Sequence, residues 1–248
     1  MSPSSPMSRK EIKPGAVFIA DAHYHGERDL LVSLLQSFLK NPPPQVFLMG
    51  DIFDLLIGNF PYLMEKNRPL IDVIEALGKQ CEVFFFEGNH DFLLNGKIKH
   101  ITYVPLSQQP MLFEMGGKTA ALSHGDYDEG LAHNVLTRLL RNRFFIFLVH
   151  LVTFNFINNW YLKKTERKLK AKKLCRKFED FEAYIGKKIK KNFQNADLII
   201  EGHYHQGVSI KYGGKLYCNI DGFACNQSYS VVESTQDKIS LSANQYKR

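Results

Sequence analysis

Residues 46–54 read Val-Phe-Leu-Met-Gly-Asp-Ile-Phe-Asp, an apolar run that ends in a glycine and a carboxylate. Four other apolar runs of strand length lie along the chain, over residues 16–20, 83–86, 119–122 and 198–200. Continuous rather than alternating apolarity is typical of strands that are covered on both faces. Segments with helical spacing separate the first three runs. The sequence therefore predicts a layered α/β sheet.

Two helices are predicted between these strands. One covers Leu30 to Phe38, where leucines recur at helical spacing and three prolines follow, and the other covers residues 69–77. After residue 202 the pattern changes to short alternating segments, which predict a hairpin over residues 208–220 and two strands, 229–233 and 238–242. We expect an α/β (α+β layered) fold, in which two sheets pack together as a β-sandwich flanked by helices.

Each of the five apolar runs is followed by a short polar motif. The motifs are Asp21-Ala22-His23, Gly50-Asp51-Ile52-Phe53-Asp54, Gly88-Asn89-His90-Asp91, His124-Gly125-Asp126 and Gly202-His203-Tyr204-His205. Ligands of open α/β sheets bind outside the carboxyl ends of the strands, where such loops converge. The carboxylate, amide and imidazole donors suit manganese, iron or zinc, and the thiolates of a structural zinc site are missing from the motifs.

These donors suffice for two metal ions. Asp51 is the expected bridge, because a carboxylate has two oxygens. One ion would take Asp21, His23 and His205, and the other would take Asn89, His124 and His203. Two ions about 3.5–4 Å apart would clamp a phosphoryl group and acidify a water molecule. His90 is then left to hydrogen-bond a phosphate oxygen or to protonate a leaving group, and the neighbouring Asp91 could fix its tautomer. Asp54 is expected to be structural.

A basic segment separates the fourth motif from the last core strand. The net charge of the chain is +7, but residues 138–191 alone hold 16 Lys and Arg against 4 acids. Such asymmetry indicates an anionic partner: lipid headgroups, nucleic acid or a phosphorylated substrate. Residues 144–157 are almost wholly apolar and are flanked by cations and by Trp160 and Tyr161. This run is too short to span a bilayer, so it is a core helix, a membrane-interface segment or a lid over a lipid substrate.

Size and composition are those of one globular domain, with 248 residues, 44% hydrophobic and 23% charged. We expect residues 1–10 to be disordered and residues 11–248 to form the domain, with an inserted helical lid at about residues 130–192. No signal peptide is visible, and no two cysteines form a CxxC pair. We therefore expect four reduced thiols in a cytoplasmic protein; they are Cys81, Cys175, Cys218 and Cys225.

The ordered motifs resemble those of the calcineurin-like metallophosphoesterase superfamily, and the resemblance runs from residue 16 to residue 205. It implies the β-sandwich fold, the two-metal ligand set given above, and His90 with Asp91 as the catalytic pair. Within the superfamily the chain is most similar to the family of UDP-2,3-diacylglucosamine hydrolases of lipid A biosynthesis. That closer similarity lies in residues 50–58 (GDIFDLLIG), residues 87–94 (EGNHDFLL) and the basic, apolar insert.

The closer similarity implies a substrate and a location. An acylated nucleotide sugar would be cleaved at its pyrophosphate to UMP and 2,3-diacylglucosamine 1-phosphate, with two divalent ions, expected to be manganese, as cofactors. The protein would be peripheral on the inner face of the cytoplasmic membrane and would touch it through the lid. The residues implied to bind substrate are Arg141, Asn142, Lys168, Lys170 and Lys172. Neither nucleic acid nor an obligate protein partner is expected.

The chain departs from that closer family at His90, where the family has Arg in Gly-Asn-Arg-Asp. The difference bears on the substrate and not on the metal chemistry, because Arg is a permanent cation while His can donate a proton. Two alternative functions follow. One is a phosphoesterase for another phosphomonoester or diester, such as a nucleotide, a phosphoprotein or a nucleic acid. The other is a binding scaffold, although scaffolds usually lose metal ligands and all seven are present here.

Overall fold

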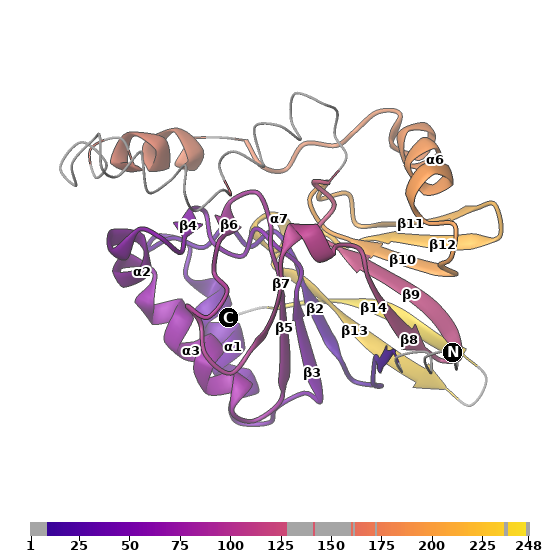
Figure 1. Ribbon diagram of the computed structural model, residues 1–248, viewed down its shortest axis with the longest axis horizontal. Helices are drawn as coiled ribbons and strands as arrows, with labels where there is room; N and C mark the ends of the chain where they lie inside the picture. The colour runs from indigo at the N-terminus through magenta and orange to yellow at the C-terminus, as the bar shows by residue number, and fades with distance from the viewer. Residues whose placement is uncertain are drawn as a thin grey trace, which may run out of the picture.

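Two six-stranded sheets form the centre of the protein in the computed structural model, which describes residues 9–127, 141, 160, 162–171, 173–235 and 238–246. The first sheet has the order β14-β13-β2-β3-β5-β7, formed by Lys238–Gln245, Ser228–Thr235, Val17–Ile19, Gln45–Leu48, Glu82–Phe86 and Thr102–Val104. The second has the order β1-β8-β9-β10-β12-β11, formed by Lys10–Glu11, Met111–Met115, Lys118–Ser123, Leu198–Glu201, Lys215–Asn219 and Val208–Tyr212. The sheets lie face to face (Figure 1), as the sequence predicted.

Aromatic side chains fill the space between the two sheets. Phe47 stacks on Phe18 and on Phe84, with ring centroids 4.4 and 4.8 Å apart. Phe113 of the opposite sheet meets Phe47 edge-on at 5.5 Å. All four rings are fully buried. Rings packed this closely fix the two sheets relative to each other, and with them the loops at the strand ends.

Helices cover the outer faces of both sheets (Figure 1). On the first sheet, α1 (Leu30–Phe38) and α3 (Arg68–Gly78) bury their apolar sides against β2, β3 and β5, and α2 (Pro61–Lys66) packs against α3 and β4. On the second sheet, α6 (Phe181–Asn192) packs its apolar face against β9, β10 and β12. The core strands are thus covered on both faces, which is the physical reason for their continuous apolarity.

The strands that precede the polar motifs run in the same direction within each sheet. β2, β3 and β5 are parallel neighbours, with Val17 opposite Val46 and Val46 opposite Val83. β9 and β10 are also parallel, with Leu122 opposite Ile200. Their carboxyl ends therefore emerge at one edge of the molecule, where the short pair β4 (Leu56–Ile57) and β6 (Asp91–Phe92) and helix α7 (Phe223–Asn226) also lie (Figure 1).

The expected insert is described only in part. Residues 162–170 are helical, and α6 follows. The apolar run 144–157 lies outside the described residues, as do residues 128–143 of the expected lid apart from Arg141. Among the helices that the structure describes, none has the length and apolarity needed to cross a bilayer.

The N-terminal prediction needs one correction. Lys10 was included in the segment predicted to be disordered, but it lies in strand β1, which pairs with β8.

Two of the four cysteines form a disulfide. Cys175 and Cys225 are 50 positions apart in the sequence, and their Cα atoms are 5.5 Å apart. The prediction of reduced thiols is wrong for this pair and is confirmed for Cys81 and Cys218, which are free. The pairing was invisible in the sequence because Cys175 lies in a loop and Cys225 in helix α7, two segments that only the folded chain brings together.

Candidate metal centre

Five of the seven predicted ligands have left-handed backbone conformations. The φ angles are 51° for Asp21, 43° for His23, 51° for Asp51, 66° for His203 and 54° for His205. Each such conformation costs a non-glycine residue about 1–3 kcal/mol and persists only where its surroundings enforce it. Here the neighbouring loops bond to each other: the Asp21 amide donates to the Gly50 carbonyl at 3.1 Å, and the His23 amide to the Asp51 carbonyl at 2.9 Å. The loops hold their side chains in a fixed, strained arrangement.

Asp21, His23 and His205 form a first cluster, with donor atoms within 4.8 Å of one another. The Nδ1 of His205 donates to the Leu174 carbonyl at 3.0 Å, so its Nε2 faces the Asp21 carboxylate at 3.0 Å. Burial alone would lower the pKa of His205, but the Asp21 carboxylate raises it. The His205 Nε2 and the Asp21 carboxylate therefore converge on one point, where a cation would bind.

Asp51, His124 and His203 form a second cluster of the same kind. The Nδ1 of His124 donates to the Met49 carbonyl at 2.8 Å, which leaves Nε2 3.5 Å from the Asp51 carboxylate and 3.4 Å from the Asn89 amide oxygen. Burial opposes protonation of His124, yet the Asp51 carboxylate raises its pKa well above the usual value. The second cluster thus gathers the four donors that the sequence predicted for one ion.

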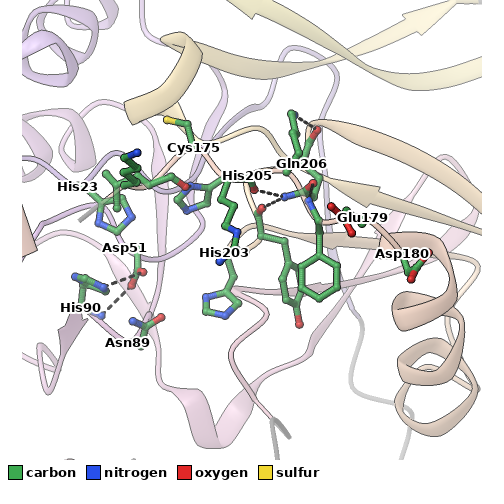
Figure 2. A pocket seen from close by; sticks show the side chains of 16 residues that line it. His23, Asp51, Asn89, His90, Cys175, Glu179, Asp180, His203, His205 and Gln206 are labelled. Atoms are coloured by element: carbon green, nitrogen blue, oxygen red, sulfur yellow. Dashed lines mark hydrogen bonds and ion pairs between the residues drawn. The ribbon is translucent and has the colours of Figure 1, made fainter. Parts of the chain in front are cut away.

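Asp51 belongs to the second cluster, and Figure 2 shows it beside His90, Asn89 and also His23 of the first cluster. Burial would raise the pKa of Asp51, but the imidazoles of His90, His124 and His23 hold it well below the usual value. The backbone N–H of His90 also donates to one carboxylate oxygen at 2.8 Å. An ionised, oriented carboxylate that faces both clusters is the chemistry expected of a bridging ligand.

The donor set fits two divalent cations. The clearest sign is His23, whose ring is 2% exposed and has no hydrogen-bond partner on either nitrogen within the described part of the chain. Buried polar groups are almost always satisfied, so this ring lacks a ligand. Burial lowers its pKa to about 3, which keeps the imidazole in the neutral form that binds metals.

The structure gives His90 a different partner from the predicted one. The Asp91 carboxylate accepts backbone N–H groups from the neighbouring loops: Asp51 at 3.1 Å, Ile52 at 2.6 Å, Phe53 at 3.1 Å and Gly88 at 3.0 Å. The Nδ1 of His90 instead donates to the backbone carbonyl of Asp54 at 2.7 Å. Asp91 therefore orders the loop that carries Asp51, and Asp54 sets the tautomer of His90.

A cavity of about 1130 Å³ opens beside the two clusters (Figure 2). Ligand side chains and His90 form one wall, and residues 173–180 form the other. Gln206 fastens that second wall, because its side chain donates to the Arg176 carbonyl at 3.1 Å and accepts the Phe178 amide at 3.0 Å. Lys173, Arg176 and Lys177 bring positive charge to the cavity. Nothing in the sequence distinguishes these three cations from the other Lys and Arg of the insert as the ones that face the candidate metal ligands.

Three of the five residues predicted to bind substrate lie in the described part of the chain. The guanidinium of Arg141 contacts the Glu87 carboxylate and donates to the Gly88 carbonyl at 3.0 Å and to Asp126 at 3.2 Å. Lys170 pairs with Glu27 at 2.9 Å, and neither Lys168 nor Lys170 lines the cavity. Asn142 and Lys172 lie outside the described residues. The sequence therefore did not predict that Arg141 braces the loops that carry Gly88 and Asp126. The only signal for this contact was the presence of the acidic residues Glu87 and Asp126 at two of the motifs.

Replacing Gly88 with alanine should lower hydrolysis by about 10²-fold, because misplacing a catalytic group by about 1 Å has effects of that order. A Cβ atom at Gly88 would lie 2.3 Å from the Asp51 carboxylate and 2.4 Å from the Asp51 nitrogen. The measurement is kcat/KM with a soluble phosphodiester, alongside metal content. Gly26→Ala is the matched control, since nothing lies within 4 Å of its new methyl group. Equal activities of the two variants would contradict the tight packing around Asp51.

A protein-family model described as calcineurin-like phosphoesterase matches residues 16–207. Among curated relatives, UDP-2,3-diacylglucosamine hydrolase of Haemophilus influenzae is 32% identical over 114 residues, which cover 44% of this chain and 47% of that protein. The protein of the same name from Coxiella burnetii is 29% identical over 116 residues, covering 44% of this chain and 46% of its own. The matched part spans about half the length of these relatives.

Two solved structures are also similar. A dimetal phosphatase from Danio rerio superposes with a TM-score of 0.48 and 14% identity, covering 93% of this chain and 96% of that one. An archaeal phosphodiesterase superposes with a TM-score of 0.48 and 11% identity, covering 92% of this chain and 99% of that one.

Proposed function

This chain belongs to the calcineurin-like phosphoesterase family, and we propose that it is a two-metal phosphoesterase that cleaves the pyrophosphate of UDP-2,3-diacylglucosamine, giving UMP and 2,3-diacylglucosamine 1-phosphate. The observation that carries the proposal is the gathering of two donor clusters around the buried Asp51 at the wall of one cavity. The names of the relatives from Haemophilus influenzae and Coxiella burnetii support the choice of substrate.

The ligands divide between two ions as the clusters do, with Asp51 shared. Two divalent ions, proposed to be manganese, would polarise the phosphoryl group and acidify a water molecule. His90 turns its Nε2 toward the cavity, 3.9 Å from the Asp51 carboxylate. Because its Nδ1 already donates to the Asp54 carbonyl, the ring gives a proton from Nε2 to a phosphate oxygen or to the leaving group when both nitrogens are protonated, and in the neutral form Nε2 accepts a proton instead. Lys173 and Arg176, on the opposite wall, can neutralise the remaining phosphate charge of a diphosphate.

Exposed apolar groups beside cations support a membrane-surface location, which we propose to be the inner face of the cytoplasmic membrane. Trp160 is 61% exposed, and the Lys164 ammonium lies 5.2 Å from its ring centroid. Phe178, which lines the cavity, is 47% exposed. Aromatic rings flanked by lysines are typical of membrane interfaces. Lys168 and Lys170 would then contact anionic headgroups, with the apolar run 144–157 as the remainder of the lid.

The proposed activity is tested with purified protein, UDP-2,3-diacylglucosamine and manganese, following UMP release. We expect UMP to appear with added metal and to stop when a chelator is added. UDP-glucose, which has the same pyrophosphate but no acyl chains, is the matched comparison and should be cleaved far more slowly. A metal-loaded protein that releases no UMP but cleaves a soluble phosphodiester would contradict the lipid substrate and leave the metal chemistry intact.

His90 favours a second candidate function. The wider superfamily has histidine at this position and the lipid A enzymes have arginine, so a soluble phosphomonoester or diester is the alternative substrate. This alternative predicts similar turnover of soluble diesters and of the acylated nucleotide sugar. A scaffold without activity is the least supported function, because the side chains of all seven predicted ligands are gathered as a metal centre requires.

A further inference from the structure

Lys188 is a buried lysine on a helix whose other lysines are mostly exposed. It belongs to α6, and its side chain is 8% exposed. Its ammonium group donates to the Gly125 carbonyl at 2.7 Å, to the Glu201 carboxylate at 3.0 Å and to the Tyr204 hydroxyl at 3.2 Å. An ammonium has three N–H donors, so all of them have acceptors here.

Glu201 links the same ammonium to the strands of the second sheet. It is the last residue of β10 and is fully buried. Its carboxylate accepts the Ser123 hydroxyl of β9 at 2.8 Å and the Tyr217 hydroxyl of β12 at 3.0 Å. Ser123 directly precedes His124 in the chain, and Glu201 lies two residues before His203. The buried Lys188–Glu201 pair is therefore directly behind two ligands of the second cluster.

The two loops that Lys188 joins also pack against each other. A Cβ atom at Gly125 would lie 3.2 Å from the Cβ of His203, and the rings of His124 and His203 are 5.0 Å apart. The Lys188 ammonium lies over the rings of Tyr127 and Tyr204, at 4.6 and 5.1 Å from their centroids. Its contacts thus hold the backbone just after His124 and the side chain just after His203.

The first cluster is held by other groups. His205 is oriented by the Leu174 carbonyl, and the His203 amide bonds to the Asp21 carboxylate at 2.8 Å. In the described part of the chain, no hydrogen bond or ion pair joins Lys188 to Asp21, His23 or His205. Lys188 therefore supports the loops of the second cluster and makes no such contact with the ligands of the first.

We propose that Lys188 is a positioning residue for one of the two metal sites, the site formed by Asn89, His124 and His203 with the shared Asp51. It does not touch the metal or the substrate. By tying the Gly125 carbonyl to Tyr204, it sets the separation of His124 and His203 and hence the affinity of that site for a divalent ion. The inference rests on the two-ion centre of the proposed function but not on the identity of the substrate.

The test measures manganese binding to the full chain by calorimetry, without any substrate. His23→Ala weakens the first cluster and leaves the second as the better site, and His203→Ala does the reverse. We expect Lys188→Met to lower manganese affinity about 10–100-fold in the His23→Ala background, as loss of a supporting contact behind a metal ligand does. In the His203→Ala background it should leave the affinity unchanged. Lys187→Met, on the exposed side of the same helix, is the matched control and should change neither.

Equal losses in both backgrounds, or no loss in either, would overturn the inference. Lys188→Met leaves Glu201 buried without its cation, so the double variant Lys188→Met/Glu201→Gln is measured as well; the amide keeps an acceptor for Ser123 and Tyr217. The same site-selective loss is expected there, and manganese affinity restored to that of wild type would overturn the inference. A wild-type protein that binds only one ion would overturn the two-ion centre itself, whereas two ions bound equally well with and without Lys188 would overturn this inference alone.

Discussion

Replacing Asp51 with asparagine should lower hydrolysis by about 10³-fold or more, because the carboxylate that we propose to bridge the two ions would become a neutral amide with a single oxygen. The metal ions are expected to contribute several kcal/mol of transition-state stabilisation, and each 1.36 kcal/mol is about tenfold in rate. The substitution preserves size, and the amide oxygen can still accept the His90 N–H that bonds to the carboxylate at 2.8 Å. The loss should therefore come from the metal centre and not from unfolding. Both kcat/KM and the number of bound ions per chain are measured.

Asp72→Asn is the matched control for this variant. Asp72 lies on α3, its side chain is 56% exposed, and it pairs with Arg68 one helical turn away. Loss of such an exposed pair should leave activity and metal content at wild-type values. An Asp51→Asn protein that still binds two ions and keeps more than about a tenth of the activity would show that another group bridges the ions.

The second large effect is expected from His90→Ala, which should lower kcat by about 10²–10⁴-fold, the usual contribution of a positioned proton donor. The His90 ring lines the cavity and is 6% exposed, and its Nδ1 is fixed by the Asp54 carbonyl. The two hydrogen bonds that hold the surrounding loop, from the His90 amide to Asp51 and from the Gly88 amide to Asp91, do not involve the ring. Metal binding should therefore change far less than turnover.

Leaving groups of different basicity separate the two roles available to His90. A proton donor matters most for a basic leaving group, so the loss should be larger for an alkyl phosphodiester than for a nitrophenyl one. His90→Arg places a permanent cation at the same position without a proton that is readily donated, and it should retain KM better than kcat. His100→Ala, an exposed histidine in another loop, serves as the control. A uniform loss with all leaving groups would assign His90 to phosphate binding alone.

The core of the fold was predictable because its strands are buried on both faces. β2, β3, β5, β9 and β10 all appear within about one residue of the predicted runs. The strands that the sequence did not indicate are short or only partly buried. β4 and β6 have two residues each, and β8 mixes exposed with buried positions, so their pairing depends on neighbours that are distant in the sequence.

The candidate metal ligands could be proposed from the sequence for a related reason, since their residue types and their position after apolar runs are both written in the chain. The contacts that orient them were not. Backbone groups supply several, such as the carbonyls of Asp54, Met49 and Leu174, and any residue type would offer the same group. Lys188 and Arg141 act across the fold on loops far away in the sequence, and a single sequence carries no distances. Most of the hydrogen bonds and ion pairs that orient the site side chains could therefore be identified only from the folded structure.

The place of β2 in the first sheet has a consequence for how the protein is made. One edge of β2 pairs with β3, which follows soon after, but the other pairs with β13, about 200 residues later. At 5–20 residues per second, roughly 10–40 s of translation separate the two strands. Throughout that time the nascent chain presents an open, apolar strand edge of the kind that recruits other strands. Release from the ribosome in good yield should thus depend on chaperones that shield this edge until β13 arrives.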